Sequence, residues 1–214
     1  MNRYTEPDYK SAALITIDIQ SDTLDGQPLE VPGTSAILPK MCILLGEARR
    51  ARLHIIHIVR IYKRDGSNVD LCRRGFVEEG NAILAKDSPG CELADELRPS
   101  SETKLNFDFL LDGGIQELQP KEMVIYKPRW GAFYETPLHD YLKKQNISTL
   151  IFTGCNFPNC PRTSIYEASE RDFRVVLVTD AVSGLYQQGI KEMKNIGVTL
   201  LTTQELVNEL RKLN

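Results

Sequence analysis

The feature that most restricts the fold is a series of six short apolar runs, separated by stretches in which apolar residues recur at helical spacing. The runs cover residues 12–19, 53–59, 121–126, 150–154, 174–181 and 198–201. Strands that are apolar on both faces are typical of parallel sheets covered by helices on each side. The sequence therefore predicts an α/β three-layer sandwich with a six-stranded, mostly parallel sheet, and we interpret residues 1–214 as a single domain.

Residues 60–122 interrupt this alternation. They contain polar loops, a short helical pattern near 79–86 and another near 107–111. A connection this long inside a compact domain usually serves function or assembly. We therefore expect it to act either as a lid over a site or as a contact between subunits.

Cys160 stands between an apolar run that ends at Gly154 and a helical pattern. Pro161 suits the first turn of a helix, so Cys160 is expected at or beside the N-cap. The unpaired N–H groups and the positive end of the helix dipole there would favour the thiolate, which is the nucleophilic form. Most free cysteines are inert core residues, but a strand–loop–helix junction is a place that presents a thiol.

Two charged residues stand at the ends of other apolar runs. Asp18 lies within the first run, where an unpaired carboxylate is costly, and Lys127 directly follows the third. In open parallel sheets, ligands bind beyond the carboxyl ends of the strands, where the strand order reverses. We therefore expect Asp18, Lys127 and Cys160 to meet in one crevice. Taken singly, Asp18 could cap a loop and Lys127 could be a solvated lysine at a strand end.

Composition and charge exclude several classes of partner. The net charge is −3 and no basic run occurs, so nucleic acid is not expected. The apolar runs are far shorter than a membrane span, and the first eight residues lack the apolar core of a signal peptide. The five cysteines form no disulfide framework, which favours the reducing cytoplasm. Cys155 and Cys160 lack a second pair of ligands, so a zinc site is not expected.

Four motifs follow one another along nearly the whole chain: residues 15–20, residues 126–133, Gly154 with Cys160 six residues on, and residues 180–181. Together they resemble the isochorismatase-like cysteine hydrolases, which include nicotinamidase, N-carbamoylsarcosine amidohydrolase, ureidoacrylate amidohydrolase and biuret hydrolase. The resemblance implies the strand order 3-2-1-4-5-6, a catalytic triad of Asp18, Lys127 and Cys160, no cofactor, and a homo-oligomer (dimer or tetramer). It also implies a non-proline cis peptide between Cys155 and Asn156.

The implied reaction is hydrolysis of a C–N bond in a small amide, carbamoyl or ureido substrate. Asp18 would take the thiol proton, Cys160 would attack the carbonyl, and water would hydrolyse the acyl-enzyme. Lys127 would hold Asp18 and the developing charge in place, and the backbone N–H groups of Asn156 and Cys160 would form the oxyanion hole. Nicotinamidases carry an Asp/His/His metal site after the second strand. Residues 60–64 contain no His, so no metal is expected and nicotinamide is disfavoured.

Residues that flank the expected triad in sequence are candidates for the substrate pocket, and arginines could pair with a substrate carboxylate through bidentate bonds. The candidates are Gln20, Arg73, Arg74, Arg129, Trp130, Phe133, Tyr134, Asn156 and Phe157. The aromatic residues could equally belong to the core or to an interface. At least one of the arginines is expected to be solvated or to lie between subunits.

Two other functions stay open. The fold could hydrolyse a vinyl ether of the isochorismate type, which uses the acid and the lysine without a thiol, so that a Cys160 variant would still turn over isochorismate. The presence of Cys160 argues against this reaction. The chain could also be a silent binding or assembly module, in which Cys160 would be unreactive toward iodoacetamide at neutral pH.

Overall fold

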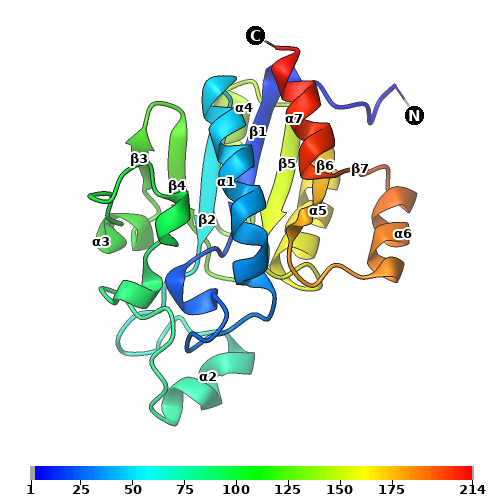
Figure 1. The fold of residues 1–214 in the computed structure, drawn as a ribbon. Helices are drawn as coiled ribbons and strands as arrows, with labels where there is room; N and C mark the ends of the chain where they lie inside the picture. The colour runs from blue at the N-terminus through cyan, green and yellow to red at the C-terminus, as the bar shows by residue number, and fades with distance from the viewer. Residues whose placement is uncertain (1–2, 214) are drawn as a thin grey trace.

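The computed structural model describes residues 3–213; Met1 and Asn2, which begin the polar N-terminal stretch, and Asn214 lie outside the described residues. The centre of the protein is a seven-stranded sheet with helices on both faces (Figure 1). Its order is β3-β4-β2-β1-β5-β6-β7. The strands are β1 (Ala12–Ile17), β2 (His54–Val59), β3 (Ile115–Gln119), β4 (Glu122–Tyr126), β5 (Thr149–Gly154), β6 (Arg174–Val182) and β7 (Thr199–Leu201).

The parallel part of the sheet runs from β4 through β2, β1, β5 and β6 to β7, which is the predicted order of strands. The prediction of six strands is wrong, because β3 pairs antiparallel with β4 at the edge. None of the residues of β3 is buried, so this strand lacks the continuous apolar run that identifies the others in the sequence. Because β2 and β5 flank β1 on opposite sides, a crevice is expected at the carboxyl ends of β1 and β5.

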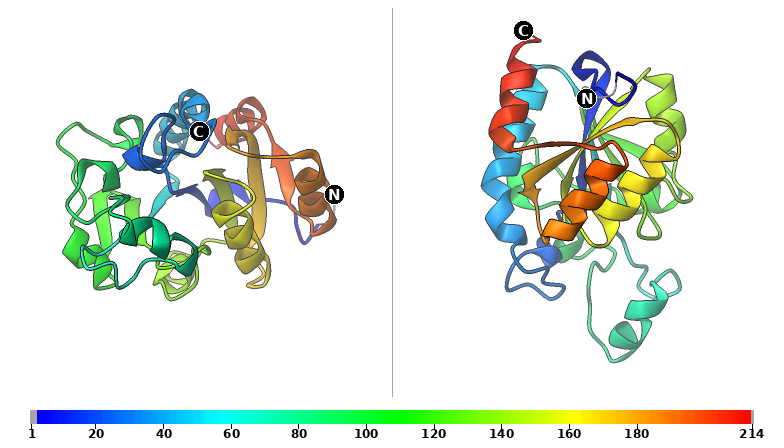
Figure 2. Two further views of the ribbon diagram at one scale, coloured as in Figure 1. Left: turned by 90° about the horizontal axis from the view of Figure 1, so that it is seen from below. Right: turned by 90° about the vertical axis from the view of Figure 1, so that its right-hand side faces the viewer.

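Helices cover both faces of the sheet (Figure 2). The helices α1 (Thr34–Arg50) and α7 (Thr203–Arg211) pack on one face, and α4 (Leu138–Lys144), α5 (Cys160–Ser169) and α6 (Gln187–Asn195) cover the other. Neighbouring residues of β1 serve the two layers, since Leu14 packs toward α1 and Ile15 packs on the opposite face. The predicted layering is therefore confirmed. Short 3-10 helices lie at Tyr9–Ser11, Ser21–Thr23, Pro89–Cys91 and Asp95–Leu97.

The connection 60–122 forms an apolar cluster of its own beside β4. It contains α3 (Phe107–Leu111) at the predicted place. The predicted helix at 79–86 is wrong, because Gly80 and Leu84 have left-handed backbones that exclude a helix; the helix α2 lies earlier, at Leu71–Glu78. The helix α2 protrudes from the body of the protein at the carboxyl edge of the sheet, and none of its residues is buried (Figures 1 and 2).

We also compared the helices with the requirements for a membrane span. No helix in residues 3–213 combines the length and the apolar character needed to cross a bilayer. The longest, α1, has 17 residues and carries charged residues in its last turn.

Candidate active site

The three reactive side chains singled out in the sequence come together at the carboxyl edge of the sheet. Asp18 directly follows β1, Lys127 directly follows β4, and Cys160 is the first residue of α5. The Nζ atom of Lys127 lies 2.9 Å from Oδ2 of Asp18, so the two form a buried ion pair. Cys160 lines the same cavity as Asp18. All three residues are buried, with exposed fractions of 7 % for Asp18, 0 % for Lys127 and 4 % for Cys160.

The carboxylate of Asp18 is positioned by an unusual backbone. The residue has φ +52°, a left-handed conformation that is uncommon outside glycine but that Asp adopts more readily than most residues. Its carbonyl accepts hydrogen bonds from Thr23 Oγ1 at 2.9 Å and from Cys155 Sγ at 3.1 Å. One carboxylate oxygen pairs with Lys127, whereas the other, Oδ1, is buried without a hydrogen-bond partner among the described residues. Such an unsatisfied oxygen is rare in folded proteins, and it leaves lone pairs free to accept a proton.

Cys160 is a thiol rather than a thiolate at neutral pH. Burial raises its pKa to about 11, the Asp18 carboxylate adds to the rise, and Lys127 and Arg60 partly offset it. The expectation that the start of α5 favours the thiolate is therefore wrong. Desolvation and a neighbouring negative charge outweigh the helix dipole, whose effect is about 0.3–1 kcal/mol.

The loop between β5 and α5 turns at Gly154. This residue has φ +118°, and a Cβ atom added there would lie 2.3 Å from the carbonyl oxygen of Ile17, so only glycine fits. The described residues contain no cis peptide bond, so the predicted cis bond between Cys155 and Asn156 is wrong. The turn at Gly154 already redirects the chain, and a trans bond avoids the roughly 3 kcal/mol that a non-proline cis bond costs.

Asp18 and Cys160 line a cavity of about 20 Å³. This is room for about one water molecule, so the cavity in this state is smaller than any amide substrate. Its walls come from loops at the carboxyl edge of the sheet and from α2. The lining residues are Asp18, Thr23, Leu29, Val31, Arg60, Arg73, Leu84, Trp130, Cys155, Asn156, Asn159 and Cys160.

Arg60 is a site residue that the sequence reasoning missed. It directly follows β2 and is only 2 % exposed. Its Nη1 atom lies 2.8 Å from both carboxylate oxygens of Asp70, and its Nη2 donates to the carbonyl of Arg129 at 2.6 Å. Burial lowers the pKa of the guanidinium, but Asp18, Tyr62 and Asp70 raise it more, so that its pKa lies above the ordinary value. A permanent positive charge therefore borders the cavity.

Three of the predicted substrate-binding residues do line the cavity: Arg73, Trp130 and Asn156. The guanidinium of Arg73 lies 4.9 Å from the centre of the Trp130 ring, and that of Arg60 lies 5.8 Å from it. Both distances are within the range of a cation–π contact. The indole of Trp130 is thus held by two cations, one from the end of β2 and one from α2.

The other polar candidates lie outside the cavity. Gln20 is fully buried and joins two loops, because its Nε2 donates to the carbonyls of Arg60 at 2.8 Å and Cys91 at 2.6 Å. The side chain of Arg129 is exposed. Its backbone carbonyl accepts a hydrogen bond from Arg60 and another, at 3.2 Å, from Lys127. Arg74 is exposed on α2 and lines a separate groove at the surface.

Three aromatic candidates also lie elsewhere. Phe133 and Phe157 are buried in the apolar core between the sheet and the layer of α4, α5 and α6. The ring of Phe157 packs on Tyr186, with 5.5 Å between the ring centres. Tyr134 is 49 % exposed. Of the aromatic candidates, Trp130 alone is among the residues that line the cavity.

Most of the lining residues missed by the sequence reasoning come from loops, namely Leu29, Val31, Leu84, Cys155 and Asn159, and one more, Thr23, ends the 3-10 helix Ser21–Thr23. Tertiary contacts place them, such as the 2.6 Å bond from the amide of Leu84 to Asp22 Oδ2. Arg60 is different, because it follows β2, the strand beside β1. The strand-end rule that selects Asp18 and Lys127 would have selected it as well.

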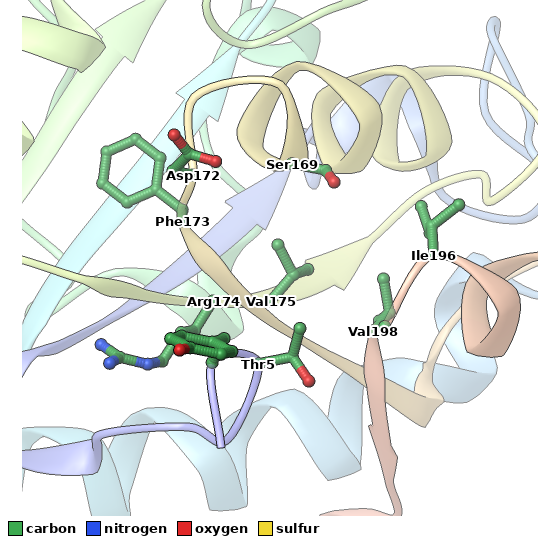
Figure 3. A pocket seen from close by; sticks show the side chains of 10 residues that line it. Thr5, Ser169, Asp172, Phe173, Arg174, Val175, Ile196 and Val198 are labelled. Carbon is green, nitrogen blue, oxygen red and sulfur yellow. The ribbon is translucent and has the colours of Figure 1, made fainter. Parts of the chain in front are cut away.

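Larger hollows lie away from these side chains. Figure 3 shows one of about 410 Å³, with Phe173, Val175 and Val198 among its lining residues. It lies at the amino ends of β6 and β7, which is the opposite edge of the sheet from Cys160. Within residues 3–213, no group of three or more His, Cys, Asp or Glu residues is arranged to hold a metal ion.

Comparisons with known proteins bear on this geometry. The family model described as the Isochorismatase domain matches residues 12–107 and 112–205. An Arabidopsis thaliana protein named as a probable inactive nicotinamidase is 30 % identical over 94 % of this chain and 97 % of its own length. A ureidoacrylate amidohydrolase of Methylorubrum extorquens is 23 % identical over 81 % of this chain and 70 % of its own length. The crystal structure of an isochorismatase family protein from Desulfovibrio vulgaris has a TM-score of 0.79 at 30 % identity, covering 94 % of this chain and 98 % of that one.

Proposed function

The chain belongs to the isochorismatase family, and from this premise we propose that it is a cysteine-dependent hydrolase of a C–N bond in a small amide, carbamoyl or ureido substrate. The observation that carries the proposal is the cavity in which Cys160 lies beside the Asp18–Lys127 ion pair. The relative named ureidoacrylate amidohydrolase supports a C–N bond as the point of cleavage.

Nicotinamide is not the substrate we propose. Nicotinamidases carry a metal site after the second strand. In this chain Arg60 follows β2, and Ile61, Tyr62 and Lys63 come next. The buried guanidinium of Arg60 would repel a cation at this place, so these residues do not fit a metal site. The proposed reaction therefore uses no metal ion.

The proposed reaction begins with the thiol proton of Cys160. This proton is still bound at neutral pH, since the pKa of the thiol is raised to about 11. As Sγ attacks the carbonyl carbon of the substrate, the proton passes to Asp18, whose Oδ1 has no other hydrogen-bond partner among the described residues. Attack and proton transfer are coupled, because a free thiolate is unfavourable in so buried a position.

The carbonyl oxygen becomes negative in the tetrahedral intermediate, and we propose that the amides of Asn156 and Cys160 bind it. The neighbouring amides of Cys155 and Phe157 donate to backbone carbonyls, whereas no backbone acceptor is found for Asn156 or Cys160 among the described residues. Free amides at the start of α5 suit an oxyanion. Each such donor typically lowers the barrier by about 3 kcal/mol.

Collapse of the intermediate breaks the C–N bond. The proton held by Asp18 passes to the leaving nitrogen, so that ammonia or an amine departs and the acyl group stays on Cys160 as a thioester. Water then attacks the thioester and gives a proton to Asp18, which returns it to the departing sulfur. Lys127 holds the carboxylate in position through both halves, at the 2.9 Å distance seen here.

The test is ammonia release from a panel of small primary amides, carbamoyl amino acids and ureido acids. We expect Cys160→Ala to lower turnover by more than about 10³-fold without loss of the fold, because the nucleophile is removed. The matched control is Cys42→Ala, which alters an exposed cysteine on α1 and should keep full activity.

Other outcomes would contradict the proposal in distinct ways. Amide hydrolysis retained by Cys160→Ala would remove the covalent mechanism. Turnover of isochorismate by the same variant would favour vinyl-ether hydrolysis instead. If no substrate of the panel reacts and Cys160 resists iodoacetamide, the chain is better described as a silent binding module.

A further inference from the structure

The cavity has an aliphatic wall that the proposed reaction does not use. Its residues are Leu29, Val31 and Leu84. The backbone amide of each donates to one short element, the 3-10 helix Ser21–Thr23. The carbonyl oxygens of Asp22 and Thr23 accept from the first two residues, at 3.0 and 3.1 Å, and Oδ2 of Asp22 accepts from the third, at 2.6 Å. Because this helix closely follows Asp18, it ties the aliphatic wall to the carboxylate of the site.

The residues of this wall differ in how firmly they are held. Leu29 and Val31 are half-buried, and they lie on the loop 24–33, whose residues 25–28 are exposed. Leu84 is 2 % exposed and belongs to the apolar cluster of the connection 60–122. The cavity of about 20 Å³ must enlarge before an amide can enter. The half-buried loop is the part of this wall that is easier to displace, so Leu84 is the fixed boundary.

The backbone of Leu84 shows how strongly its position is determined. Its φ of +45° is an outlier for a bulky residue, and such conformations persist where the surrounding structure over-determines them. The amide of Leu84 donates to Asp22, and its carbonyl accepts from the amide of Tyr62 at 2.9 Å. Leu84 is therefore held from both sides.

The carboxylate that holds Leu84 is itself fixed in place. Asp22 is 7 % exposed, and its carboxylate lies against the backbone of Gly90. A Cβ atom added at Gly90 would lie 1.8 Å from Oδ1 of Asp22, so a larger residue there would displace the carboxylate. Glycine at position 90 thus leaves the space in which Asp22 meets the amide of Leu84.

We propose that Leu84 limits the size of the substrate that can reach Cys160, and that Asp22 is the positioning residue that holds Leu84 in place. This inference rests on the proposed function, and it narrows the substrates to compact members of the amide, carbamoyl and ureido classes. The limit is steric, because a methylene group that is too many for an apolar pocket lowers kcat/KM by about 10- to 200-fold.

The test measures access to Cys160 and needs no turnover. The protein is treated with iodoacetamide and with its larger N-ethyl and N-butyl derivatives, and alkylation of Cys160 is followed by peptide mass spectrometry. Each rate is divided by that of the exposed Cys42 in the same sample, which corrects for the reactivity of the reagent. We expect the corrected rate to fall from the smallest reagent to the largest. Leu84→Ala should raise the rate with the N-butyl reagent, relative to that with iodoacetamide, by about 10-fold or more. Leu84→Gly should do the same, since glycine adopts the left-handed backbone freely.

Further variants separate this role from a general loosening of the fold. Leu110→Ala truncates another leucine of the same apolar cluster, one that is fully buried and does not line the cavity. It should lower the free energy of unfolding and keep the dependence on reagent size. Asp22→Ala should relax the size dependence as the Leu84 variants do, and Asp22→Asn, which retains an acceptor oxygen, should restore most of it.

The possible outcomes decide the inference and the proposed function separately. The same size dependence in Leu84→Ala, Leu84→Gly and the unaltered protein would overturn the inference, as would an equal relaxation in Leu110→Ala or resistance of Cys160 to every reagent in all variants. Cys160-dependent ammonia release combined with an unchanged size dependence in the Leu84 variants would overturn this inference and leave the proposed function standing. Relaxed size dependence in these variants, without hydrolysis of any panel compound, would do the reverse.

Discussion

Two buried carboxylates, Glu122 and Asp18, each belong to a network of charged and polar side chains on or beside β1 and β4. The two networks differ in how completely the carboxylate oxygens are hydrogen-bonded. In the first network, Glu122 of β4 is 1 % exposed and all its bonds are made inside the protein. Its Oε1 accepts from Arg49 Nη2 at 2.7 Å and lies 3.0 Å from His57 Nε2, while Oε2 accepts from Arg49 Nε at 2.9 Å and from Gln119 at 2.6 Å. The other ring nitrogen of His57 lies 2.8 Å from Thr16 Oγ1.

In the second network, Asp18 follows the same strand that contains Thr16, but it is only half paired. One oxygen bonds to Lys127 and the other has no partner among the described residues. The backbone of Asp18 is left-handed, and a cavity opens beside it. A saturated buried carboxylate stabilises and fixes the fold, whereas an unsaturated one beside a cavity keeps capacity for a proton.

The first prediction tests this contrast through activity. We expect Asp18→Asn to lower kcat by about 10²–10⁴-fold, because the amide cannot take the thiol proton. Glu122→Gln should keep kcat within a few-fold when activity is expressed per folded molecule. The measurement is ammonia release at pH 7.5, with the folded fraction taken from circular dichroism. Equal losses in the two variants would mean that the distinction between the networks is false.

The second prediction concerns the free energy of unfolding instead of activity, and here Glu122 is the residue expected to matter. We expect Glu122→Gln to lower the free energy of unfolding by about 3 kcal/mol, because the half-buried guanidinium of Arg49 loses its counterion and the side chains of His57 and Gln119 lose a charged acceptor. Glu117→Gln on β3, where the carboxylate is exposed, should change it by less than about 0.5 kcal/mol. Urea denaturation at pH 7 gives both values. A Glu122→Gln protein as stable as the Glu117→Gln control would show that the saturated network does not hold the fold.

The third prediction concerns acid. Burial raises the pKa of Glu122, but the hydrogen bonds from Arg49 and His57 lower it more, from an ordinary value of 4.5 to about 2. A carboxyl group with a depressed pKa in the folded state stabilises the protein above pH 4.5 and loses that contribution as the pH falls toward 2. We expect about 2 kcal/mol of the free energy of unfolding to disappear across this window, after allowance for screening. The slope should be shallower in Glu122→Gln, and an unchanged slope would place the acid sensitivity elsewhere.

The smallest effect should come from Thr16→Val, which keeps the shape of the side chain and removes one hydrogen bond to His57. We expect a loss of about 1 kcal/mol in the free energy of unfolding and no change in kcat. Chemical denaturation and ammonia release on the same preparation measure the two quantities. A large fall in kcat would show that the hydrogen bond between Thr16 and His57 influences the active site through β1.

The sequence predicted most of the fold because apolar periodicity is a local signal. It missed β3, whose residues are partly exposed at the edge of the sheet. The two histidines of β2, His54 and His57, make ring-nitrogen contacts to side chains of the fold, such as Tyr141 Oη at 2.9 Å from His54 Nδ1.

The site was predictable where strand ends determine it, and less so where loops do. Asp18, Lys127 and Cys160 gather because β1, β4 and β5 end at one edge of the sheet. Phe157 flanks the site in sequence, yet its ring turns into the core, and no local pattern distinguishes it from Trp130, which lines the cavity. The pKa of Cys160 depends on burial, which the position at a helix start does not reveal.

The most direct test of the account follows loss of activity and modification of Cys160 in the same sample. The protein is treated with iodoacetamide for increasing times, and each cysteine is quantified by peptide mass spectrometry while ammonia release is measured. We expect the remaining activity to equal the fraction of unmodified Cys160, whatever the state of the exposed Cys42 and Cys72. Activity that persists when Cys160 is fully alkylated, or that disappears while Cys160 is still free, would contradict the claim that its sulfur carries the reaction.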